Sequence, residues 1–257
     1  MDVKGTILFI QEWIKKYHIS SKTDGFVIGI SGGIDSAVTS TLIAKAGIPL
    51  LCLEMPIHQD IEQVNRASKH LSYLKEIYPN VSSLEINLSN VFDNFKEKVP
   101  TNNHRSELAL ANTRARLRMS TLYYYGQINN YLVAGTGNKI EDFGIGFFTK
   151  YGDGGVDISP IADLLKSEVY LIAHELGVSK TIIKAPPTDG LWGDNKTDED
   201  QIGATYTELE WAMNQNKMLD NLNSRQLEVL KIYKSLNLKN QHKILPIPVC
   251  IIPKNLK

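Results

Sequence analysis

The chain has 257 residues, with 28 lysines and arginines balanced by 28 aspartates and glutamates. That length suits one large α/β domain, and we predict a single domain over residues 1–257. A neutral chain offers no basic field to a nucleic-acid backbone, and its two cysteines form no CxxC pair, so a nucleic-acid partner and a cysteine-based metal site are both disfavoured.

Residues 1–17 place apolar side chains at helical spacing between charged ones, which predicts an opening helix. The segment has no uninterrupted apolar core and no small-residue cleavage site, so it is not a signal peptide. No stretch of the chain is apolar over the length that spans a bilayer. We therefore expect a cytoplasmic protein without a membrane partner, with Cys52 and Cys250 reduced and buried.

The stretch 26–38 joins an apolar, β-branched run to a helical pattern through Ser31-Gly32-Gly33. Adjacent glycines let backbone N–H groups approach a ligand, and the start of the helix adds further donors and a partial positive charge. This corner is predicted to bind an anion, with Asp35 holding a divalent metal beside the phosphates. The alternative is an ordinary strand-to-helix turn that Ser31 or Asp35 caps.

Strands predicted at 48–56 and 83–88 alternate with helices at 60–74 and 90–99. This alternation predicts a doubly wound parallel sheet with flanking helices and right-handed crossovers. Ligands of such sheets lie beyond the carboxyl ends of the strands, so segment 55–59 is a second candidate for the nucleotide pocket.

Residues 105–129 show one long helical pattern with Arg114, Arg116 and Arg118 near its middle. Arg114 and Arg118 are i,i+4 neighbours, so Arg116 points elsewhere, and such an arginine can fork onto a carboxylate or phosphate. A solvated basic face is the alternative. The tyrosines at 123–125 surround the helix with rings, which indicates cover on two sides, as a subunit interface provides.

A fourth strand is predicted at 131–137, and Glu141 follows it after a short polar loop. Glu141 would face Asp35 and hold Mg²⁺ between protein and phosphates, or else lie in an exposed acidic turn. Segment 146–160 mixes glycines with aromatic and charged side chains, so we expect an irregular loop that receives a ring-bearing ligand. Lys166 follows in a predicted helix at 164–176, where its ammonium group would reach a phosphate.

The region 188–201 is polar and acidic, which indicates either an exposed loop or a lid that excludes water from the nucleotide. Helices are predicted at 205–214 and 224–236. The pair His242-Lys243 precedes two prolines and is either a plain tail or a set of ligand contacts.

Several of these motifs together carry a resemblance to known enzymes. The loop 31–36 resembles the pyrophosphate loop of the N-type ATP pyrophosphatases, and it lacks the Gly-Lys-Ser/Thr ending of a Walker loop, which disfavours γ-phosphate transfer. Over residues 4–247 the chain resembles the NAD synthetase family. The motifs that stand in the family's order are 29–36, 115–119, Gly135-Thr136 with Glu141, 147–155 with Asp157, Lys166, Leu191-Trp192, 197–199 and His242-Lys243.

The resemblance implies an adenine nucleotide alpha hydrolase-like, Rossmann-like fold and a carbon–nitrogen ligase that amidates nicotinic acid adenine dinucleotide (deamido-NAD) to NAD. ATP would activate the nicotinate carboxylate as an acyl adenylate with release of pyrophosphate, and ammonia would then displace AMP. The family also implies Mg²⁺ and a homodimer whose interface holds the dinucleotide. Glutamine-using members carry an extra amidohydrolase domain for which this chain has no spare length, so we expect free ammonia as donor.

The resemblance assigns roles by position. Asp35 and Lys166 would be catalytic, and Asp35 and Glu141 would bind the metal. The positions that would contact ATP are Gly29, Ile30, Ser31, Gly32, Gly33, Ile34, Asp35, Ser36, Thr136, Lys166 and Thr188. The positions that would contact deamido-NAD are Arg116, Lys150, Asp157, His242 and Lys243, with Phe148 near the pyridine ring.

Two positions depart from the family pattern, and two rival functions stay open. Some relatives are one residue shorter between Glu141 and Phe147, and relatives often have alanine where Asp189 follows Thr188. The rivals are another N-type ATP pyrophosphatase that adenylates a different substrate and a regulatory protein that binds ATP without turnover. A regulatory protein would not need Glu141.

Overall fold

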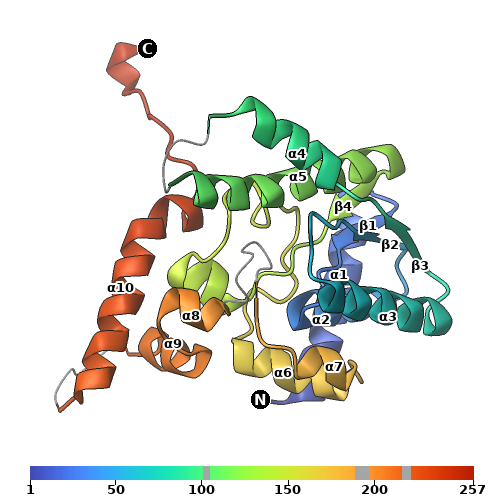
Figure 1. The fold of residues 1–257 in the computed structure, drawn as a ribbon, viewed down its shortest axis with the longest axis horizontal. Helices are drawn as coiled ribbons and strands as arrows, with labels where there is room; N and C mark the ends of the chain where they lie inside the picture. Colours follow the sequence, from blue (N-terminus) through green and yellow to red (C-terminus); the bar gives the residue numbers. More distant parts are fainter. Residues whose placement is uncertain (101–104, 189–196, 216–220) are drawn as a thin grey trace.

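A four-stranded parallel sheet in the order β3-β2-β1-β4 lies at the centre of the computed structural model, with helices on both faces (Figure 1). The structure describes residues 1–100, 105–188, 197–215 and 221–257. The strands are β1 (Gly25–Gly29), β2 (Leu50–Glu54), β3 (Val81–Glu85) and β4 (Tyr131–Val133). The predicted doubly wound parallel sheet is confirmed.

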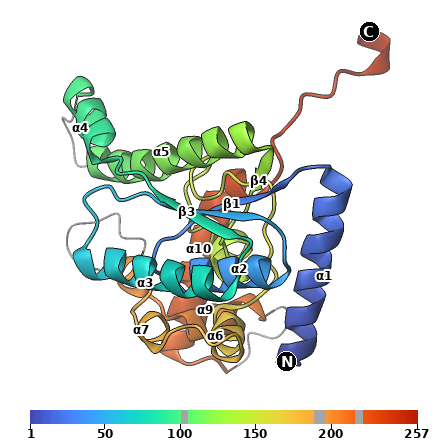
Figure 2. The ribbon, with the colours of Figure 1, turned by 90° about the vertical axis from the view of Figure 1, so that its right-hand side faces the viewer.

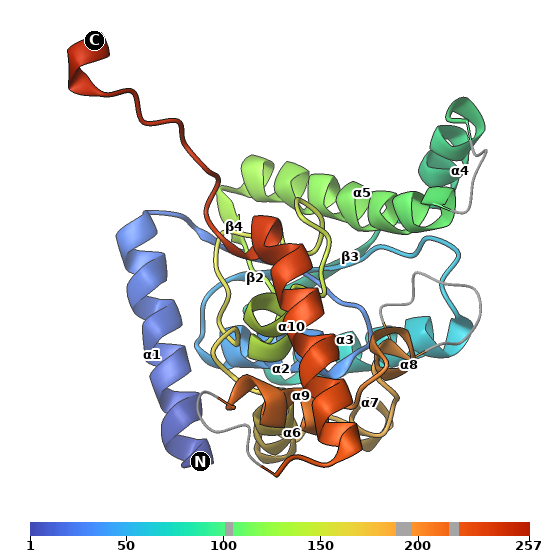
Figure 3. The same cartoon turned by 90° about the vertical axis from the view of Figure 1, so that its left-hand side faces the viewer.

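The helices occupy the connections between these strands and most of the chain after β4 (Figures 2 and 3). They are α1 (Val3–Ser21), α2 (Ile34–Lys45), α3 (Ile61–Ile77), α4 (Ser89–Lys98), α5 (Arg105–Asn129), a π-helix (Ile140–Ile145), α6 (Lys166–Glu175), α7 (Lys180–Ile183), α8 (Asp198–Ile202), α9 (Tyr206–Met213), α10 (Ser224–Ile244) and a short 3₁₀ turn (Lys254–Leu256).

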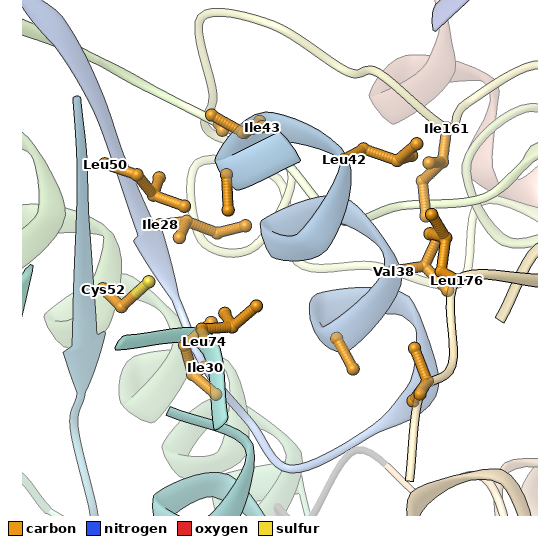
Figure 4. Packing of buried hydrophobic residues seen from close by; sticks show 14 of the residues in the cluster. Ile28, Ile30, Val38, Leu42, Ile43, Leu50, Cys52, Leu74, Ile161 and Leu176 are labelled. Carbon is orange, nitrogen blue, oxygen red and sulfur yellow. The ribbon is translucent and has the colours of Figure 1, made fainter. Parts of the chain in front are cut away.

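Successive side chains of a strand point to opposite sides of the sheet. Because β1 and β2 are apolar at nearly every position, they present apolar side chains to both faces. Ile28 of β1 packs in a cluster that also takes Leu42 from α2 and Leu74 from α3 (Figure 4). Its neighbour Val27 joins a second cluster, which includes Phe92 of α4 and residues of α5. Burial on both faces explains why β1 and β2 are continuous hydrophobic runs in the sequence.

A third hydrophobic cluster lies apart from the sheet. It joins Ile140 and Ile145 of the π-helix to Leu209 of α9 and to Val229 and Leu230 of α10. This cluster fixes α9 and α10 beside the loop that follows β4, which brings residues from the last quarter of the chain to the end of the sheet (Figure 3).

The order of the strands places a topological switch point between β1 and β4. The chain leaves β1 toward β2 and returns through β3 to β4 on the other side of β1. Connections from the carboxyl ends of β1 and β4 therefore diverge and leave a crevice, the usual ligand position of open α/β sheets.

Several observed elements differ in extent from the predicted ones; the fourth strand, for example, ends at Val133 rather than 137. The third strand ends at Glu85 rather than 88, although Ile86 N and Leu88 N still donate to the carbonyls of Glu54 and Pro56. Residues 140–145, between the fourth strand and the glycine-rich segment 146–160, form a π-helix. The last long helix continues from 236 to Ile244 and so includes His242 and Lys243, which excludes a plain tail there.

The two cysteines lie in different surroundings. Cys52 is buried in β2, as expected, and burial raises the pKa of its thiol to about 12. Cys250 is exposed in the segment after α10, so the expectation of two buried thiols is wrong for this residue. Among the helices of the described ranges, not one has the length and apolar character needed to cross a bilayer.

Candidate active site

A pocket of about 630 Å³ opens at the switch point of the sheet. Its walls come from the loop after β1, the carboxyl ends of β2 and β3, the inner face of α5, the region 134–155 and the last turn of α10. Segments far apart in the sequence thus meet at one place, as the fold requires.

The glycine corner, residues 29–36, forms one end of this pocket. Gly32 has φ +79°, and a Cβ built on it would come within 2.4 Å of the Gln63 carbonyl oxygen, so this position requires glycine. Ser31 Oγ accepts from Gly33 N at 3.2 Å, and Ser36 Oγ donates to the Gly33 carbonyl at 3.0 Å. Within the described part of the chain, no side chain caps α2 at Gly33, so its first turn can donate to an anion.

Lys166 connects two carboxylates at the mouth of the glycine corner. Its Nζ lies 2.6 Å from Asp35 Oδ2 and 3.0 Å from Glu141 Oε1, and the side chain is only 3% exposed. The three groups come from α6, α2 and the π-helix. Tyr206 of α9 donates to Glu141 Oε1 at 2.6 Å, which orients that carboxylate.

The charges in this cluster set each other's protonation. Burial alone would lower the pKa of the Lys166 ammonium, but the negative charges of Asp35 and Glu141 outweigh it and raise that pKa. Burial raises the pKa of Asp35, against the charge of Lys166. For Glu141 the charge of Lys166 and the hydrogen bond from Tyr206 outweigh burial, so its pKa is lowered. Lys166 is therefore a fixed cation beside the glycine corner.

Asp35 and Glu141 also offer a site for a hard divalent cation. Across the described residues, no group of three or more histidine, cysteine, aspartate or glutamate side chains is placed to hold a metal. Mg²⁺ needs fewer protein ligands, since it binds through one or two carboxylates together with phosphates and water. Both carboxylates already converge on one cation, Lys166, next to the glycine corner, so the donor set fits Mg²⁺.

Basic residues line the opposite end of the pocket, where α10 meets the loop after β4. Lys243 Nζ donates to the Phe148 carbonyl at 2.6 Å, and Lys150 Nζ donates to the His242 carbonyl. Arg116 of α5 donates to the Lys150 carbonyl from Nε and Nη2, both at 3.3 Å. These contacts join α5, the glycine-rich loop and α10 into one wall.

Asparagine side chains explain why α10 extends to this wall. Asn237 Nδ2 donates to the Gly144 carbonyl at 2.7 Å, and Asn240 Nδ2 donates to the Ile145 carbonyl at 2.8 Å. The last carbonyl groups of the π-helix thus accept hydrogen bonds from side chains of α10. The turn of a π-helix holds more residues than an α-helical turn, and this one spans Ile140–Ile145.

The structure brings together nearly all of the side chains that the sequence singled out. The glycine corner, Thr136, Glu141, Lys166 and Thr188 line the pocket, as do the predicted dinucleotide contacts Arg116, Lys150, His242 and Lys243, with Phe148. The arginines also divide as predicted. Arg118 donates to the Met55 carbonyl at 2.9 Å and Arg114 stacks over Phe92, whereas Arg116 points to the glycine-rich loop.

Asp157 is the exception among these candidates. It is not part of the described pocket wall. Its carboxylate instead accepts from Val133 N at 2.8 Å and from the Tyr123 hydroxyl at 3.0 Å, which holds the glycine-rich loop against β4 and α5. Its contact with the dinucleotide stays a prediction.

Two residues that contact Asp35 or Glu141 were not among the predicted site residues. Asn138 Oδ1 accepts from the backbone N–H groups of Ile140 and Glu141, while its Nδ2 lies 3.3 Å from Asp35 Oδ1. An asparagine just before a helical turn is a capping signal that marks such a role. Tyr206 carries no comparable signal, because it lies 65 residues from its partner Glu141.

The predicted lid falls largely outside the described residues, including Leu191-Trp192. The part that follows is ordered by local contacts: Thr197 caps α8 and accepts from Asp200 N at 3.1 Å. Asp198, in the first turn of α8, lines the pocket.

Comparisons with known proteins agree with this geometry. The sequence model described as NAD synthase matches residues 6–246. A protein of Carboxydothermus hydrogenoformans named NH(3)-dependent NAD(+) synthetase is 39% identical over 241 residues, 90% of each chain. The structure of an NMN synthetase from Francisella tularensis matches with a TM-score of 0.85 at 30% identity, covering 99% of each chain.

A further solved structure, the NH3-dependent NAD synthetase of Campylobacter jejuni in complex with a nitrate ion, matches with a TM-score of 0.79 at 27% identity. It covers 98% of this chain and 100% of the other. Sequence and fold therefore agree over nearly the whole length, and the chain belongs to the NAD synthase family, among enzymes named as ammonia-dependent NAD synthetases.

Proposed function

We propose that the chain amidates deamido-NAD to NAD, with ATP as activating substrate and ammonia as nitrogen donor. In the first step a nicotinate carboxylate oxygen bonds to the α-phosphorus of ATP, the bond from that phosphorus to the bridging oxygen breaks, and pyrophosphate leaves. In the second step the ammonia nitrogen bonds to the acyl carbon, AMP leaves, and a proton passes to solvent. The observation that carries the proposal is the buried Lys166, fixed between Asp35 and Glu141 at the glycine corner.

Each group at the glycine corner has a chemical task in the proposal. The backbone N–H groups of residues 29–36 hold the pyrophosphate part of ATP, with Thr136 and Thr188 as further ATP contacts. Lys166 places a fixed positive charge where negative charge grows as pyrophosphate departs. Mg²⁺ held by Asp35 and Glu141 would add neutralisation of the phosphate charge.

The position of carboxylates and ammonium groups along the pocket supports an orientation for the substrates. Glu54 and Glu85 pair across β2 and β3 and line one end, and Ser68 Oγ donates to Glu54 Oε2 at 2.7 Å. The uncharged nucleoside of ATP, with its hydroxyl and amino donors, suits the two carboxylates of this end. The phosphate-bearing nicotinate substrate suits the other end, near Lys150 and Lys243.

The contacts proposed for deamido-NAD share that basic end. Flat area comes from the Phe148 ring, which would lie beside the pyridine ring. Asp157 is included because of its place in the motif. In the single chain its carboxylate accepts hydrogen bonds from Val133 N and the Tyr123 hydroxyl. The full set is Arg116, Lys150, Asp157, His242 and Lys243.

We also propose that the enzyme is a cytoplasmic homodimer with the site at the interface. Tyr124 of α5 supports this proposal, because its side chain is 62% exposed in the single chain although it lies edge-on to Tyr125. Exposed tyrosines on a helix face are typical of protein interfaces. The free thiols of Cys52 and Cys250 agree with a reducing compartment.

A second candidate reaction is the amidation of nicotinic acid mononucleotide. It is favoured by the likeness to the Francisella NMN synthetase, whose TM-score of 0.85 exceeds the 0.79 of the Campylobacter NAD synthetase. The two acids share the nicotinate ribose phosphate and differ only in the attached AMP. The same basic end of the pocket suits both.

One experiment tests both candidates and the rival functions. Purified protein is incubated with ATP, Mg²⁺ and ammonium, separately with each acid, and AMP, pyrophosphate and the amide product are followed by liquid chromatography and mass spectrometry. Equal amounts of AMP and NAD support the first candidate, and a higher kcat/KM with the mononucleotide supports the second. A parallel reaction with glutamine in place of ammonium is expected to give no product. No AMP with either acid would overturn the proposal in favour of another adenylated substrate or of nucleotide binding without turnover.

A further inference from the structure

After α10 ends at Ile244, the chain leaves the body of the molecule as an extended arm, residues 245–257 (Figures 1, 2 and 3). The three views agree that the arm projects away from the sheet and its helices. Its large apolar side chains are exposed, between 49% and 80%: Leu245, Ile247, Val249, Ile251, Ile252 and Leu256. Such a run of apolar side chains in water is unfavourable unless something covers it.

The pattern of the arm suits a docking strand. Four apolar residues alternate at 245, 247, 249 and 251, so in an extended chain they share one face. Pro246 and Pro248 stand between them and remove backbone donors, which opposes addition to a sheet edge and favours a stiff extended form. None of the three hydrophobic clusters formed by the described residues takes a side chain from the arm.

The same chain carries an exposed surface that suits a proline-rich apolar strand. Phe9, Trp13 and Tyr17 follow each other at i, i+4 and i+8 on the outer side of α1, and they are 72%, 38% and 39% exposed. The rings of Trp13 and Tyr17 are stacked with centroids 5.6 Å apart. Aromatic rows of this kind bind extended, proline-containing segments.

We propose that the arm docks on a second copy of this chain, along the Phe9-Trp13-Tyr17 row of the partner copy's α1, and that the exchange is reciprocal. The proposal rests on the homodimer proposed above and names the contact that holds it together. Thirteen residues reach about 43 Å when extended, enough to cross a neighbouring subunit of this size. The zero net charge of the chain puts no electrostatic barrier between two copies.

The area available fits the need of a stable dimer. Each buried aliphatic side chain removes about 60–120 Å² of apolar area from water. Two arms with the four side chains of the shared face each, together with a matching receiving area, bury on the order of 1,000–1,900 Å², which overlaps the roughly 1,200–2,000 Å² of a specific interface. A second copy also supplies arm and receiving row in equal number, which an unrelated partner does not.

The arm is continuous with the wall of the pocket. It begins two residues after Lys243, which holds the Phe148 carbonyl, and three after His242, whose carbonyl accepts from Lys150. Anchoring the arm on a partner copy therefore fixes the last turn of α10 against the glycine-rich loop. The dimer is expected to bind the nicotinate substrate more tightly than the monomer.

The first test measures the mass of the full-length protein by light scattering after gel filtration, over a range of concentrations. A variant with Ile247→Ser, Val249→Ser and Ile251→Ser is compared with the control Leu238→Ser, which changes a 76% exposed leucine of α10. We expect the arm variant to raise the dimer dissociation constant by roughly 100-fold or more and the control to leave it unchanged. A monomeric wild-type protein overturns the proposed homodimer itself, whereas an arm variant that dimerises like wild type overturns only the role of the arm.

The second test uses Cys250 as a built-in probe on the arm. Because Cys52 is buried and its thiol has a pKa raised to about 12, a benzophenone maleimide labels Cys250 selectively. A mixture of ¹⁴N- and ¹⁵N-labelled chains is then irradiated in the absence of oxidant. We expect crosslinks that join Cys250 of one isotopic chain to α1 of the other. Crosslinks within one isotope only, or to a surface other than α1, contradict the proposal, and Cys250→Ser is the control for unspecific labelling.

Discussion

Lys166 and Asp35 form a buried ion pair, with Nζ 2.6 Å from Oδ2, although 131 residues separate them in the chain. The pair fixes a cation at the glycine corner before any substrate arrives. A preorganised charge of this kind stabilises a transition state without reorganisation at the moment of reaction.

Replacing Lys166 with methionine keeps the length of the side chain and removes its charge. We expect AMP release to slow on the order of 10²–10³-fold, because charge on the leaving pyrophosphate is no longer met. Steady-state kinetics measure the effect, and circular dichroism checks that the variant is folded. The control is Lys139→Met, which breaks an ion pair with the 96% exposed Asp163. A Lys166→Met enzyme within tenfold of wild type would show that this cation is not used in the reaction.

Glu141→Gln tests the proposed metal site, because the amide keeps the shape of the side chain and removes its negative charge. The Mg²⁺ concentration for half-maximal AMP release is expected to rise by about 10–100-fold. A titration of activity against Mg²⁺ gives this value, and Asp163→Asn, at an exposed position, is the matched control. Unchanged Mg²⁺ dependence contradicts a ligand role for Glu141, and unchanged function altogether favours the regulatory rival.

Gly32→Ala and Gly47→Ala form a matched pair. Both glycines have positive φ, +79° and +78°, but a Cβ at Gly32 would lie 2.4 Å from the Gln63 carbonyl oxygen, whereas nothing lies within 4 Å of one at Gly47. Both variants are expected to lose about 1 kcal/mol of unfolding free energy from backbone strain. Gly32→Ala should lose more and also raise KM for ATP, since the corner must shift. Urea titration and ATP kinetics separate the two effects, and equal behaviour of both variants contradicts the role of the close approach.

His70 predicts a pH dependence of stability. Burial lowers the pKa of its imidazole from 6.5 to about 4, and its Nε2 lies 2.9 Å from Ser40 Oγ between α3 and α2. Below pH 6.5 the unfolded chain binds a proton that the folded chain refuses until about pH 4, so stability falls as the pH falls through this window. Over the whole window, urea titrations should show about 3 kcal/mol less of this loss in His70→Leu than in wild type. The exposed His174→Gln is the control, and a slope shared by all three proteins contradicts the assignment.

The two ends of the pocket are expected to respond separately to substitution. Glu54→Gln should raise KM for ATP several-fold with little effect on the nicotinate substrate, because a charge-assisted hydrogen bond weakens to a neutral one. Lys243→Gln should do the reverse, since it removes a cation from the basic end, where the nicotinate substrate is proposed to bind. Initial rates with each substrate varied in turn measure both, and Lys234→Gln, an exposed lysine of α10, is the control. The opposite pattern would reverse the proposed orientation of the substrates.

Local patterns in the sequence determined much of the fold. The apolar runs of β1 and β2 predicted buried parallel strands, and the helical spacing at 105–129 gave the bounds of α5. The Ser31-Gly32-Gly33 corner was predicted as a sharp turn before a helix, because glycine at positive φ and an open helix start are properties of a few consecutive residues. Most of the side chains that the family motifs singled out line the pocket.

Only the tertiary structure decided how these pieces meet. The contact of Lys166 with both Asp35 and Glu141, the hydrogen bond from Tyr206 and the reach of α10 to Ile244 depend on packing between segments far apart in the chain. The same holds for Asp157, which binds Val133 and Tyr123 instead of lining the pocket. Short-range spacing encodes helices, strands and turns, whereas the partners of a side chain are fixed by the burial of apolar faces that brings distant elements together.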